Sequence, residues 1–209
     1  MATAPSNVRR TQQERSDATT AELLSAAREL FAQDGYAGTS LDAIAAAAGV
    51  TKGALYHHFD SKRDVFRAVY EAEQRALAEI ESKAYHGEAD PWEGFYAACR
   101  AFLEASLDPR VQQITLLDAP GALGLDTVHE IEADALAMTR DGLRHAMEAG
   151  RIPSRPVEPL AQLVFGALCQ AATTIARSDD QKGELRGMLA ELRRMLDALA
   201  AAPAEPARG

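Results

Sequence analysis

Three residues between positions 52 and 57 could form hydrogen bonds and ion pairs with a polyanion. Lys52 and Tyr56 are four residues apart, so in a helix they share one face, and His57 follows directly. Leu55 and Phe59 repeat at the same spacing on another face, which we expect to pack inward. The exposed face of this short helix then carries a cation, a phenol and an imidazole. These groups have the chemistry of a recognition helix in the major groove of DNA.

A tight turn and a second short helix precede this face. Thr39 with Asp42 three residues later fits a capping box, which predicts that the preceding helix begins there. Gly49 suits the left-handed backbone position that ends a helix, and Thr51 suits the N-cap of the next one. The apolar residues between these signals have helical spacing and are Leu41, Ile44, Ala45 and Ala48. The stretch from Thr39 to Lys62 is therefore predicted to be a helix-turn-helix.

We expect the exposed residues of this stretch to contact DNA. Tyr56 and His57 would bind mainly phosphates, and Gly53 would let the helix approach the bases closely. Lys62 lies in the first turn of the next helix, where a phosphate is favoured. The predicted contact residues are Thr39, Ser40, Thr51, Lys52, Gly53, Tyr56, His57 and Lys62.

Other interpretations of these residues stay open at this point. His57 and His58 could be an exposed and a core-edge histidine without a role, and Tyr56 could fill the core. Gly53 and Ala54 offer few direct base contacts, so the shape of the DNA could matter as much as its base edges.

The overall charge opposes nucleic-acid binding, but its distribution does not. The chain of 209 residues has a formal net charge of −9. Residues 1–67 contain eight Lys or Arg and eight Asp or Glu, so the whole excess of acid lies in residues 68–209. Because phosphate contacts depend on local charge, the first third of the chain remains compatible with DNA.

Apolar periodicity predicts an all-α protein. Hydrophobic residues make up 47% of the chain, and no stretch alternates apolar and polar residues as a strand does. Thr19 with Glu22 predicts a first helix to about Gln33, so a three-helix DNA-binding domain is expected at residues 19–64. Residues 1–18 would be a disordered tail or a basic arm along DNA. A larger helical domain is expected at residues 65–201, with a turn-rich loop at 118–124, and a frayed tail at 202–209.

Residues 23–66 closely resemble the N-terminal domain of TetR-type (tetracycline-repressor-like) transcriptional regulators. The resemblance joins A-A-R-E-L-F-A-Q-D-G-Y to G-V-T-K-G-A-L-Y-H-H-F-D-S-K at the spacing of that family. It implies a homodimer with about nine helices in each chain, of which the first three bind double-stranded DNA. It also implies that the last two helices of each subunit form a four-helix interface, and that a ligand pocket lies within the larger domain.

Two leucine-rich stripes at the C-terminal end are available for such an interface. The second stripe repeats at steps of four and three residues, as in a coiled coil. One three-helix module buries too little DNA surface for tight specific binding, so pairing on a palindromic operator is expected. The alternative is that both stripes belong to an intramolecular core. The predicted interface residues are Leu160, Val164, Leu168, Leu185, Leu189, Leu192 and Leu196.

Apolar residues of the larger domain could line a pocket for a small, largely apolar effector, although most of them could equally be ordinary core. Polar residues in apolar surroundings are further candidates, namely Asp118, Thr139, His145, Gln170 and Thr173. The predicted pocket residues are Trp92, Phe95, Tyr96, Cys99, Phe102, Leu117, Asp118, Phe165, Cys169 and Thr173.

The sequence predicts neither a metal site nor a cofactor. Cys99 and Cys169 are far apart in apolar helices and are interpreted as reduced core residues. We find no signal peptide and no apolar run of membrane-spanning length, so we expect a cytoplasmic protein without a membrane partner.

Together these observations favour a homodimeric repressor that a small effector releases from its operator. A ligand-independent regulator or an activator of the same fold is the first alternative. An all-α small-molecule-binding protein or enzyme is the second, and it is disfavoured because no residues have catalytic spacing and no glycine-rich phosphate loop is present.

Overall fold

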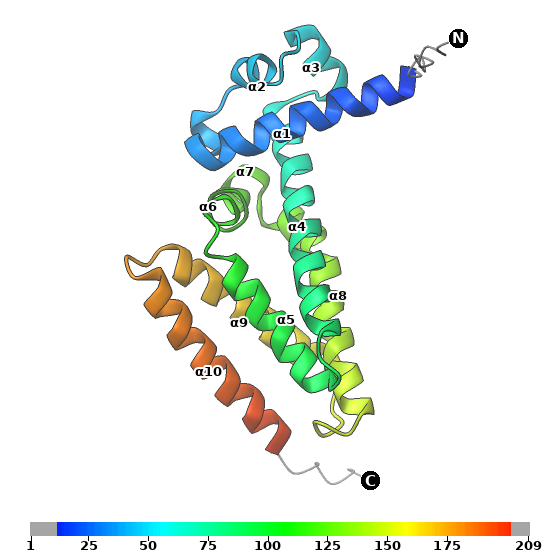
Figure 1. Cartoon of the computed structure of the whole chain (residues 1–209), viewed down its shortest axis with the longest axis vertical. Helices are drawn as coiled ribbons and strands as arrows, with labels where there is room; N and C mark the ends of the chain where they lie inside the picture. The colour runs from blue at the N-terminus through cyan, green and yellow to red at the C-terminus, as the bar shows by residue number, and fades with distance from the viewer. Residues whose placement is uncertain (1–11, 202–209) are drawn as a thin grey trace, which may run out of the picture. The chain divides into compact units, whose positions relative to one another are not determined.

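The computed structural model describes residues 12–201, and all regular elements in that range are helices (Figure 1). The predicted all-α class is therefore confirmed for these residues. Residues 1–11 of the expected N-terminal arm and the expected tail at 202–209 lie outside the described part. The chain divides into two compact units between Val69 and Tyr70, later than the boundary expected at residue 64, and each unit is described separately.

The first unit contains α1 (Gln12–Gly38), α2 (Leu41–Ala47), α3 (Lys52–His58) and the beginning of α4 (Lys62–His86). The expected start of α1 at Thr19 is wrong, because the helix already runs from Gln12. No proline or glycine interrupts residues 12–19, so the backbone stays helical through Thr20. The hydroxyl of Thr20 also donates to the carbonyl of Ser16 at 3.0 Å. Near its end α1 is kinked at Gly35, which has a φ of 69°.

The helix-turn-helix forms as expected, with one shift at its start. Ser40, and not Thr39, is the N-cap of α2, since its hydroxyl accepts a hydrogen bond from the Ala43 amide at 3.1 Å. The capping box predicted for Thr39 and Asp42 is therefore wrong by one residue. Gly49 has a φ of 67° and closes α2, and Thr51 caps α3 by accepting from the Ala54 amide at 3.2 Å.

An apolar core holds these short helices, with Phe31, Ile44, Leu55 and Phe66 fully buried. Lys62 adds a polar connection between the start of α4 and the segment that joins α1 to α2. Its ammonium donates to the carbonyls of Tyr36 at 2.7 Å and Thr39 at 2.9 Å. The same nitrogen lies 4.3 Å from the centre of the Tyr36 ring. Lys62 therefore stabilises the junction beside the helix-turn-helix.

The second unit contains the rest of α4 and the remaining helices of the chain. These are α5 (Pro91–Ala105), α6 (Pro109–Val111), the π-helix η1 (Gln112–Asp118), α7 (Ala119–Leu123), α8 (Leu125–Glu148), α9 (Val157–Ala176) and α10 (Gln181–Ala201). Because α6, η1 and α7 follow one another without a break, residues 12–201 form nine helical segments, which agrees with the expected number. The loop expected at residues 118–124 is instead helical as far as Leu123. Its Pro120 is tolerated because it lies in the first turn of α7.

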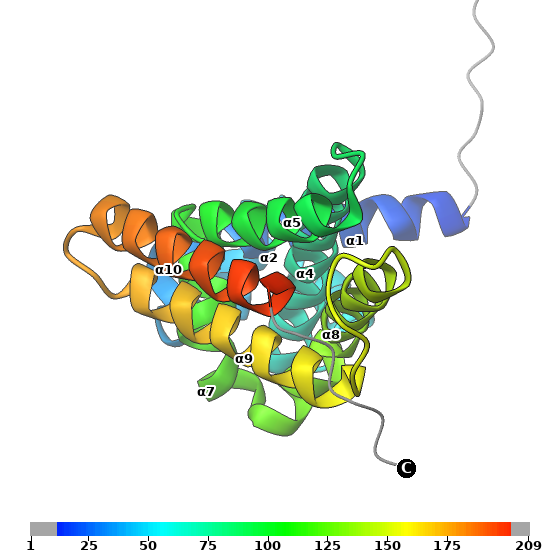
Figure 2. The ribbon, with the colours of Figure 1, turned by 90° about the horizontal axis from the view of Figure 1, so that it is seen from below.

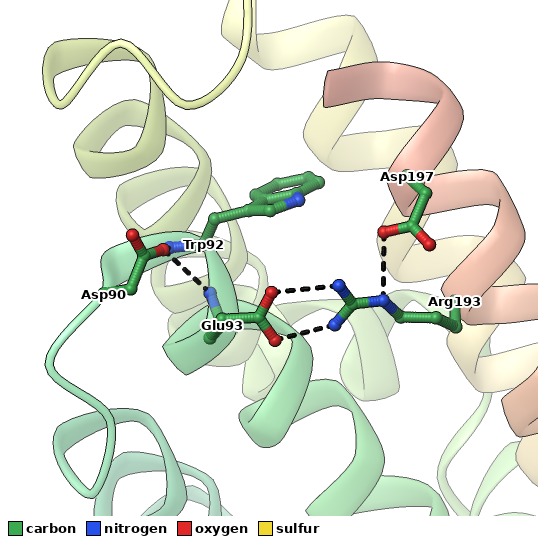
Figure 3. A network of polar contacts seen from close by, with 5 residues as sticks. All are labelled: Asp90, Trp92, Glu93, Arg193 and Asp197. Atoms are coloured by element: carbon green, nitrogen blue, oxygen red, sulfur yellow. Dashed lines mark hydrogen bonds and ion pairs between the residues drawn. The ribbon is translucent and has the colours of Figure 1, made fainter. Parts of the chain in front are cut away.

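Helices α5, α9 and α10 lie against one another and bury the main core of this unit (Figure 2). A charged network joins α5 to α10 at the edge of this core (Figure 3). Arg193 donates to both carboxylate oxygens of Glu93, at 2.6 and 2.9 Å, and its Nε lies 2.9 Å from Asp197. Asp90 caps α5 by accepting from the amides of Trp92 and Glu93. These contacts fix α10 against the beginning of α5.

The leucine stripes belong mainly to this core, so the predicted interface residues need correction. Val164, Leu168, Leu185 and Leu196 are 2–8% exposed and pack inside the unit, which leaves them inaccessible to a partner. Leu160, Leu189 and Leu192 are partly buried against the same core. The four buried residues therefore fit the intramolecular alternative, because the apolar face of each helix turns toward its own unit, whereas an interface role for Leu160, Leu189 and Leu192 stays a prediction.

Helix α9 remains apolar on its outer side as well. Val157–Ala176 is long and apolar enough to cross a membrane by length and composition alone, which corrects the sequence analysis on this point. Its inner residues, including Ala161, Ala172 and Ile175, are fully buried in the unit. Leu163, in contrast, is 73% exposed. This pattern indicates a core helix with an additional uncovered apolar surface.

The Lys62 contacts predict a loss of stability for Lys62→Met, which keeps the apolar stem and removes the ammonium. Two carbonyl acceptors would lose their charged donor, so the free energy of unfolding should fall by about 1–3 kcal/mol. Urea unfolding of the full chain, followed by circular dichroism, measures this change. Lys52→Met is the matched control, because Lys52 is mostly exposed and its removal should lower the free energy of unfolding much less than Lys62→Met does. Equal losses in the two variants would contradict the structural role of Lys62.

Candidate nucleic-acid interface and ligand cavity

The outer face of α3 presents the residues predicted for DNA contact. Lys52, Gly53 and His57 are exposed, and Tyr56 is 45% exposed. Leu55 is fully buried, which fixes the rotation of α3 about its axis. The interpretation of Tyr56 as a core residue is therefore wrong. The face offers a cation, a phenol, an imidazole and an accessible stretch of backbone within two helical turns.

Lys52 is paired within the helix-turn-helix. Its ammonium lies 2.7 Å from the carboxylate of Asp42 on α2, and both side chains are mostly exposed. The hydrogen bond to Asp42 raises the pKa of Lys52 above its ordinary value. A phosphate or base that binds Lys52 must therefore compete with Asp42. The sequence analysis assigned Asp42 only to a cap, although α2 and α3 pack as neighbours in any helix-turn-helix.

The predicted contacts near the start of α2 separate into buried and exposed residues. Thr39 is only 3% exposed and its hydroxyl donates to the carbonyl of Gly35 at 2.8 Å, so its predicted side-chain contact with DNA is wrong. Ser40 and Thr51 are exposed caps whose oxygens accept backbone amides. Lys62 is half-buried and directs its ammonium to two carbonyls, so a phosphate contact by Lys62 stays a prediction.

The two adjacent histidines differ in their surroundings. His57 is exposed on the outer face of α3. His58 is half-buried, and its Nδ1 lies 3.2 Å from the hydroxyl of Thr20 on α1. His58 therefore connects the end of α3 to the first helix, whereas His57 remains available to a partner.

The second unit contains two adjoining cavities between its helices. The large cavity has a volume of about 700 Å³ and is lined from α4, α5, α8 and α9. The small cavity has a volume of about 190 Å³ and is lined from α4, α5, η1, α7, α8 and α9. Glu81, Thr139 and Leu168 line both cavities. Their combined size is within the range of small-molecule sites.

Six of the ten predicted pocket residues line these cavities. Phe95 and Cys99 line the large cavity, and the four residues that line the small cavity are Phe102, Phe165, Cys169 and Thr173. Of the polar candidates, Thr139 lines both cavities and His145 lines the large one. Gln170 is exposed instead and donates to the hydroxyl of Thr174.

The other four predicted pocket residues have different surroundings. Trp92 is stacked on Phe95 within the core, with ring centroids 5.6 Å apart. Tyr96 lies beneath the guanidinium of Arg193 at the contact with α10. Leu117 is 37% exposed, and the carboxylate of Asp118 accepts a hydrogen bond from Gln113 at 2.9 Å. None of these four residues lines either cavity, and for the three apolar ones the reason is that apolar character alone does not distinguish core from cavity lining.

The structure adds two cavity carboxyls that the sequence analysis missed. Glu81 and Glu132 line the small cavity, and burial raises the pKa of both, that of Glu81 to about 7. Glu132 accepts a hydrogen bond from the hydroxyl of Tyr70 at 2.8 Å, whereas Glu81 has no hydrogen bond or ion pair within residues 12–201. Glu81 follows the buried Leu77 by four residues, so both lie on the same face of α4. This spacing could have identified Glu81 from the sequence.

The π-helix η1 places a residue with an unpaired polar atom in the lining of the small cavity. Thr115 is 7% exposed and lines this cavity. Its hydroxyl is the one buried side-chain polar atom among the described residues that lacks a hydrogen-bond partner. Such a group costs about 1–3 kcal/mol when it stays unpaired. The unpaired hydroxyl lies on a π-helical backbone, a local geometry that is frequent at functional sites.

The thiols and possible metal ligands give no sign of catalysis. Burial raises the pKa of Cys99 and raises that of Cys169 to about 12, so both remain protonated at neutral pH. Within the described range, no group of three His, Cys, Asp or Glu side chains is arranged to hold a metal ion.

The buried core of the first unit and the exposed face of α3 define a DNA-binding protein of the helix-turn-helix class. Comparison with known families identifies it further. Residues 23–69 match the bacterial regulatory proteins of the tetR family, and residues 92–199, more than half of the chain, match the tetracyclin repressor-like C-terminal domain. The chain belongs to the TetR family of transcriptional regulators, which bind DNA and are not enzymes.

Individual relatives agree with this assignment. SrpR from Pseudomonas putida is 30% identical over 78% of this chain and 78% of its own length. AcrR from Shigella flexneri is 44% identical over 35% of this chain, a match that covers only 34% of that protein. The solved structure of a TetR-family regulator from Pectobacterium atrosepticum is 34% identical, with a TM-score of 0.81, and covers 93% of this chain and 100% of the other.

The raised pKa of Glu81 predicts a dependence of stability on pH. Between the ordinary value of 4.5 and about 7, the folded protein holds a proton that the unfolded chain releases, so stability falls as pH rises through this window. Glu81→Gln should remove this loss and be more stable than the wild type at pH 8 by up to about 3 kcal/mol.

Urea unfolding at pH 5 and pH 8 measures this effect. The difference between Glu81→Gln and the wild type should be much smaller at pH 5. Glu79→Gln, two residues away and exposed, is the control and should change stability equally little at both values. A Glu81→Gln variant with the same pH dependence as the wild type would show that burial does not keep this carboxyl protonated.

Proposed function

We propose that this protein is a homodimeric repressor that binds a palindromic operator and is released from it by a small, largely apolar effector. The observation that carries the proposal is the exposed face of α3, where Lys52, Tyr56 and His57 are presented by a helix whose other face is buried. The proposal implies a protein of the cytoplasm, where DNA is accessible and free thiols such as Cys99 and Cys169 stay reduced.

On DNA, α3 would enter the major groove and the caps of the two short helices would approach phosphates. Lys52 would exchange its contact with Asp42 for a contact with DNA. Tyr56 and His57 would donate hydrogen bonds to phosphate oxygens from the same face. Exposed Gly53 would let the backbone approach the bases, so the contour of the groove would contribute to selectivity.

The outward side of α9 and α10 supports the dimer. Leu163 is 73% exposed and Met195 is 54% exposed, and both are apolar residues on helices that already fill the core with their inner faces. Gly166 and Ala167 on α9 are exposed and small, so a second helix could approach closely. Pairing two copies through this surface would cover apolar area and present two copies of α3 to the two halves of a palindrome.

Release by an effector requires a ligand that binds one conformation better than the other. The two cavities of the second unit are the proposed place for it. Helix α4 contributes Glu81 to these cavities, and its first residue, Lys62, lies at the junction beside the helix-turn-helix. A ligand that displaces α4 would therefore act on the support of the DNA-binding unit. A coupling free energy of about 1–3 kcal/mol would be sufficient for a regulatory response.

The α3 face predicts weaker operator binding for Lys52→Ala and Tyr56→Ala. A palindromic duplex, selected by the wild-type protein from random DNA, would be titrated in gel-shift assays at several salt concentrations. Lys52→Ala should bind at least about 10-fold more weakly and reduce the salt slope by about one per subunit. Tyr56→Ala should bind at least about 10-fold more weakly because it loses a phosphate contact.

Lys182→Ala is the charge-matched control, since Lys182 is exposed on α10 in the second unit. It should bind the operator like the wild type. Circular dichroism would confirm that all variants are folded. Wild-type affinity in both α3 variants would contradict the assignment of this face to DNA.

The outer face of α9 predicts that Leu163→Glu is monomeric. A carboxylate at a buried apolar interface would cost several kcal/mol, so the dimer should dissociate at micromolar concentration. Sedimentation velocity of the full chain measures the oligomeric state. Ile80→Glu, on α4 and 47% exposed, introduces the same charge away from α9 and α10 and should remain a dimer. A dimeric Leu163→Glu would place the interface elsewhere.

A further inference from the structure

The charge of the cavities restricts the chemistry of the effector. Glu81 lines both cavities, and no described residue provides it with a hydrogen bond or a counter-ion. The second carboxyl, Glu132, already accepts a hydrogen bond from Tyr70. Glu81 is therefore the carboxyl whose oxygens remain available to a bound molecule.

Basic residues contribute little to the lining of the small cavity. No Lys or Arg lines the small cavity, where His129 is the only basic side chain and is exposed. The large cavity is lined by Lys83, His86 and His145, all of which are exposed, and by the carboxylates of Glu79, Glu81 and Asp141. A carboxylate or phosphate in the small cavity would therefore lie beside Glu81 without a Lys or Arg to neutralise it.

The unpartnered hydroxyl of Thr115 is an independent indication of a ligand in the small cavity. It lies on η1 and lines the small cavity, which Glu81 also lines from α4. A threonine hydroxyl can accept a hydrogen bond from an N–H group as well as donate one. A ligand with several N–H donors could therefore satisfy both the carboxylate and the hydroxyl.

We propose that the effector is an organic amine, bound as an ammonium ion that donates hydrogen bonds to the Glu81 carboxylate and the Thr115 hydroxyl. This inference rests on the proposed function and names the chemical class of its effector. The apolar part of the amine lies against the hydrophobic lining, which includes Phe102, Phe165 and Leu168. The ammonium takes the place of the counter-ion that Glu81 lacks, so it recovers the unfavourable free energy of the buried carboxylate.

The geometry distinguishes this class from related ones. A neutral alcohol has one O–H donor and leaves the charge of Glu81 unbalanced. A quaternary ammonium neutralises the charge but has no N–H group for Thr115. A carboxylate repels Glu81. Affinity should therefore decrease from a primary amine to its alcohol, and further to its acid.

Calorimetric titration of the full-length protein tests this order with three probes of matched shape. These are 4-phenylbutylamine, 4-phenylbutan-1-ol and 4-phenylbutyrate, at pH 7.5 and without DNA. We expect the amine to bind at least about 10-fold more tightly than the alcohol, and the acid to bind least. The inference is overturned if the alcohol or the acid binds as tightly as the amine. It is also overturned if no phenylalkylamine with two to six methylene groups binds at millimolar concentration.

Two substitutions locate the ammonium. Glu81→Gln should weaken amine binding at least about 10-fold and leave alcohol binding unchanged, whereas Glu88→Gln, at an exposed residue outside both cavity linings, should alter neither. Thr115→Val removes a hydroxyl that has no partner, so it should leave the melting temperature unchanged or higher and still weaken amine binding several-fold. If Glu81→Gln binds the amine like the wild type, the assignment to Glu81 is wrong.

A separate gel-shift assay distinguishes this inference from the proposed function. If the amine binds through Glu81 but does not release the operator duplex, the amine site is confirmed and its role as the effector site is contradicted. If a neutral compound releases the operator while the amine does not bind, the proposed repressor function is supported and the assignment of the effector to the amines is wrong.

Discussion

A helix of seven residues is too short to be stable alone, and both α2 and α3 have this length. They persist because Ile44 and Leu55 are fully buried in the core that contains Phe31 and Phe66. This burial also fixes the rotation of α3 about its axis. Because the apolar face of the helix is turned into the core, its polar face is exposed. The DNA-binding chemistry of the protein therefore depends on the packing of a few apolar side chains.

The second unit departs from the rule that buried polar groups find partners. The buried hydroxyl of Thr115 remains unpaired in the lining of the small cavity, and the half-buried carboxyl of Glu81 has no hydrogen bond or ion pair within the described residues. A protein selected only for stability would replace them with apolar residues of similar size. Local conflicts of this kind are expected where structure is adapted to bind something, which is why these residues carry the inference about the effector.

The errors of the sequence analysis have a common physical origin. Thr39 and Ser40 are adjacent and both suit an N-cap, so only the backbone geometry decides that Ser40 caps α2 while Thr39 is buried. The leucine stripes have the spacing of an interface, but the same spacing serves a helix that packs on its own chain, as Leu185 and Leu196 do. Periodicity identifies which face is buried and does not identify what buries it.

The sequence by itself determined the all-α class, the helix-turn-helix, the exposed face of α3 and the family, because these depend on local spacing and on turn residues such as Gly49. Only the tertiary structure decided the partners of Lys62, the pairing of Lys52 with Asp42 and the lining of the cavities. These features join residues that are far apart along the chain or lie on different helices. Their free energies depend on burial and distance, which no short stretch of sequence contains.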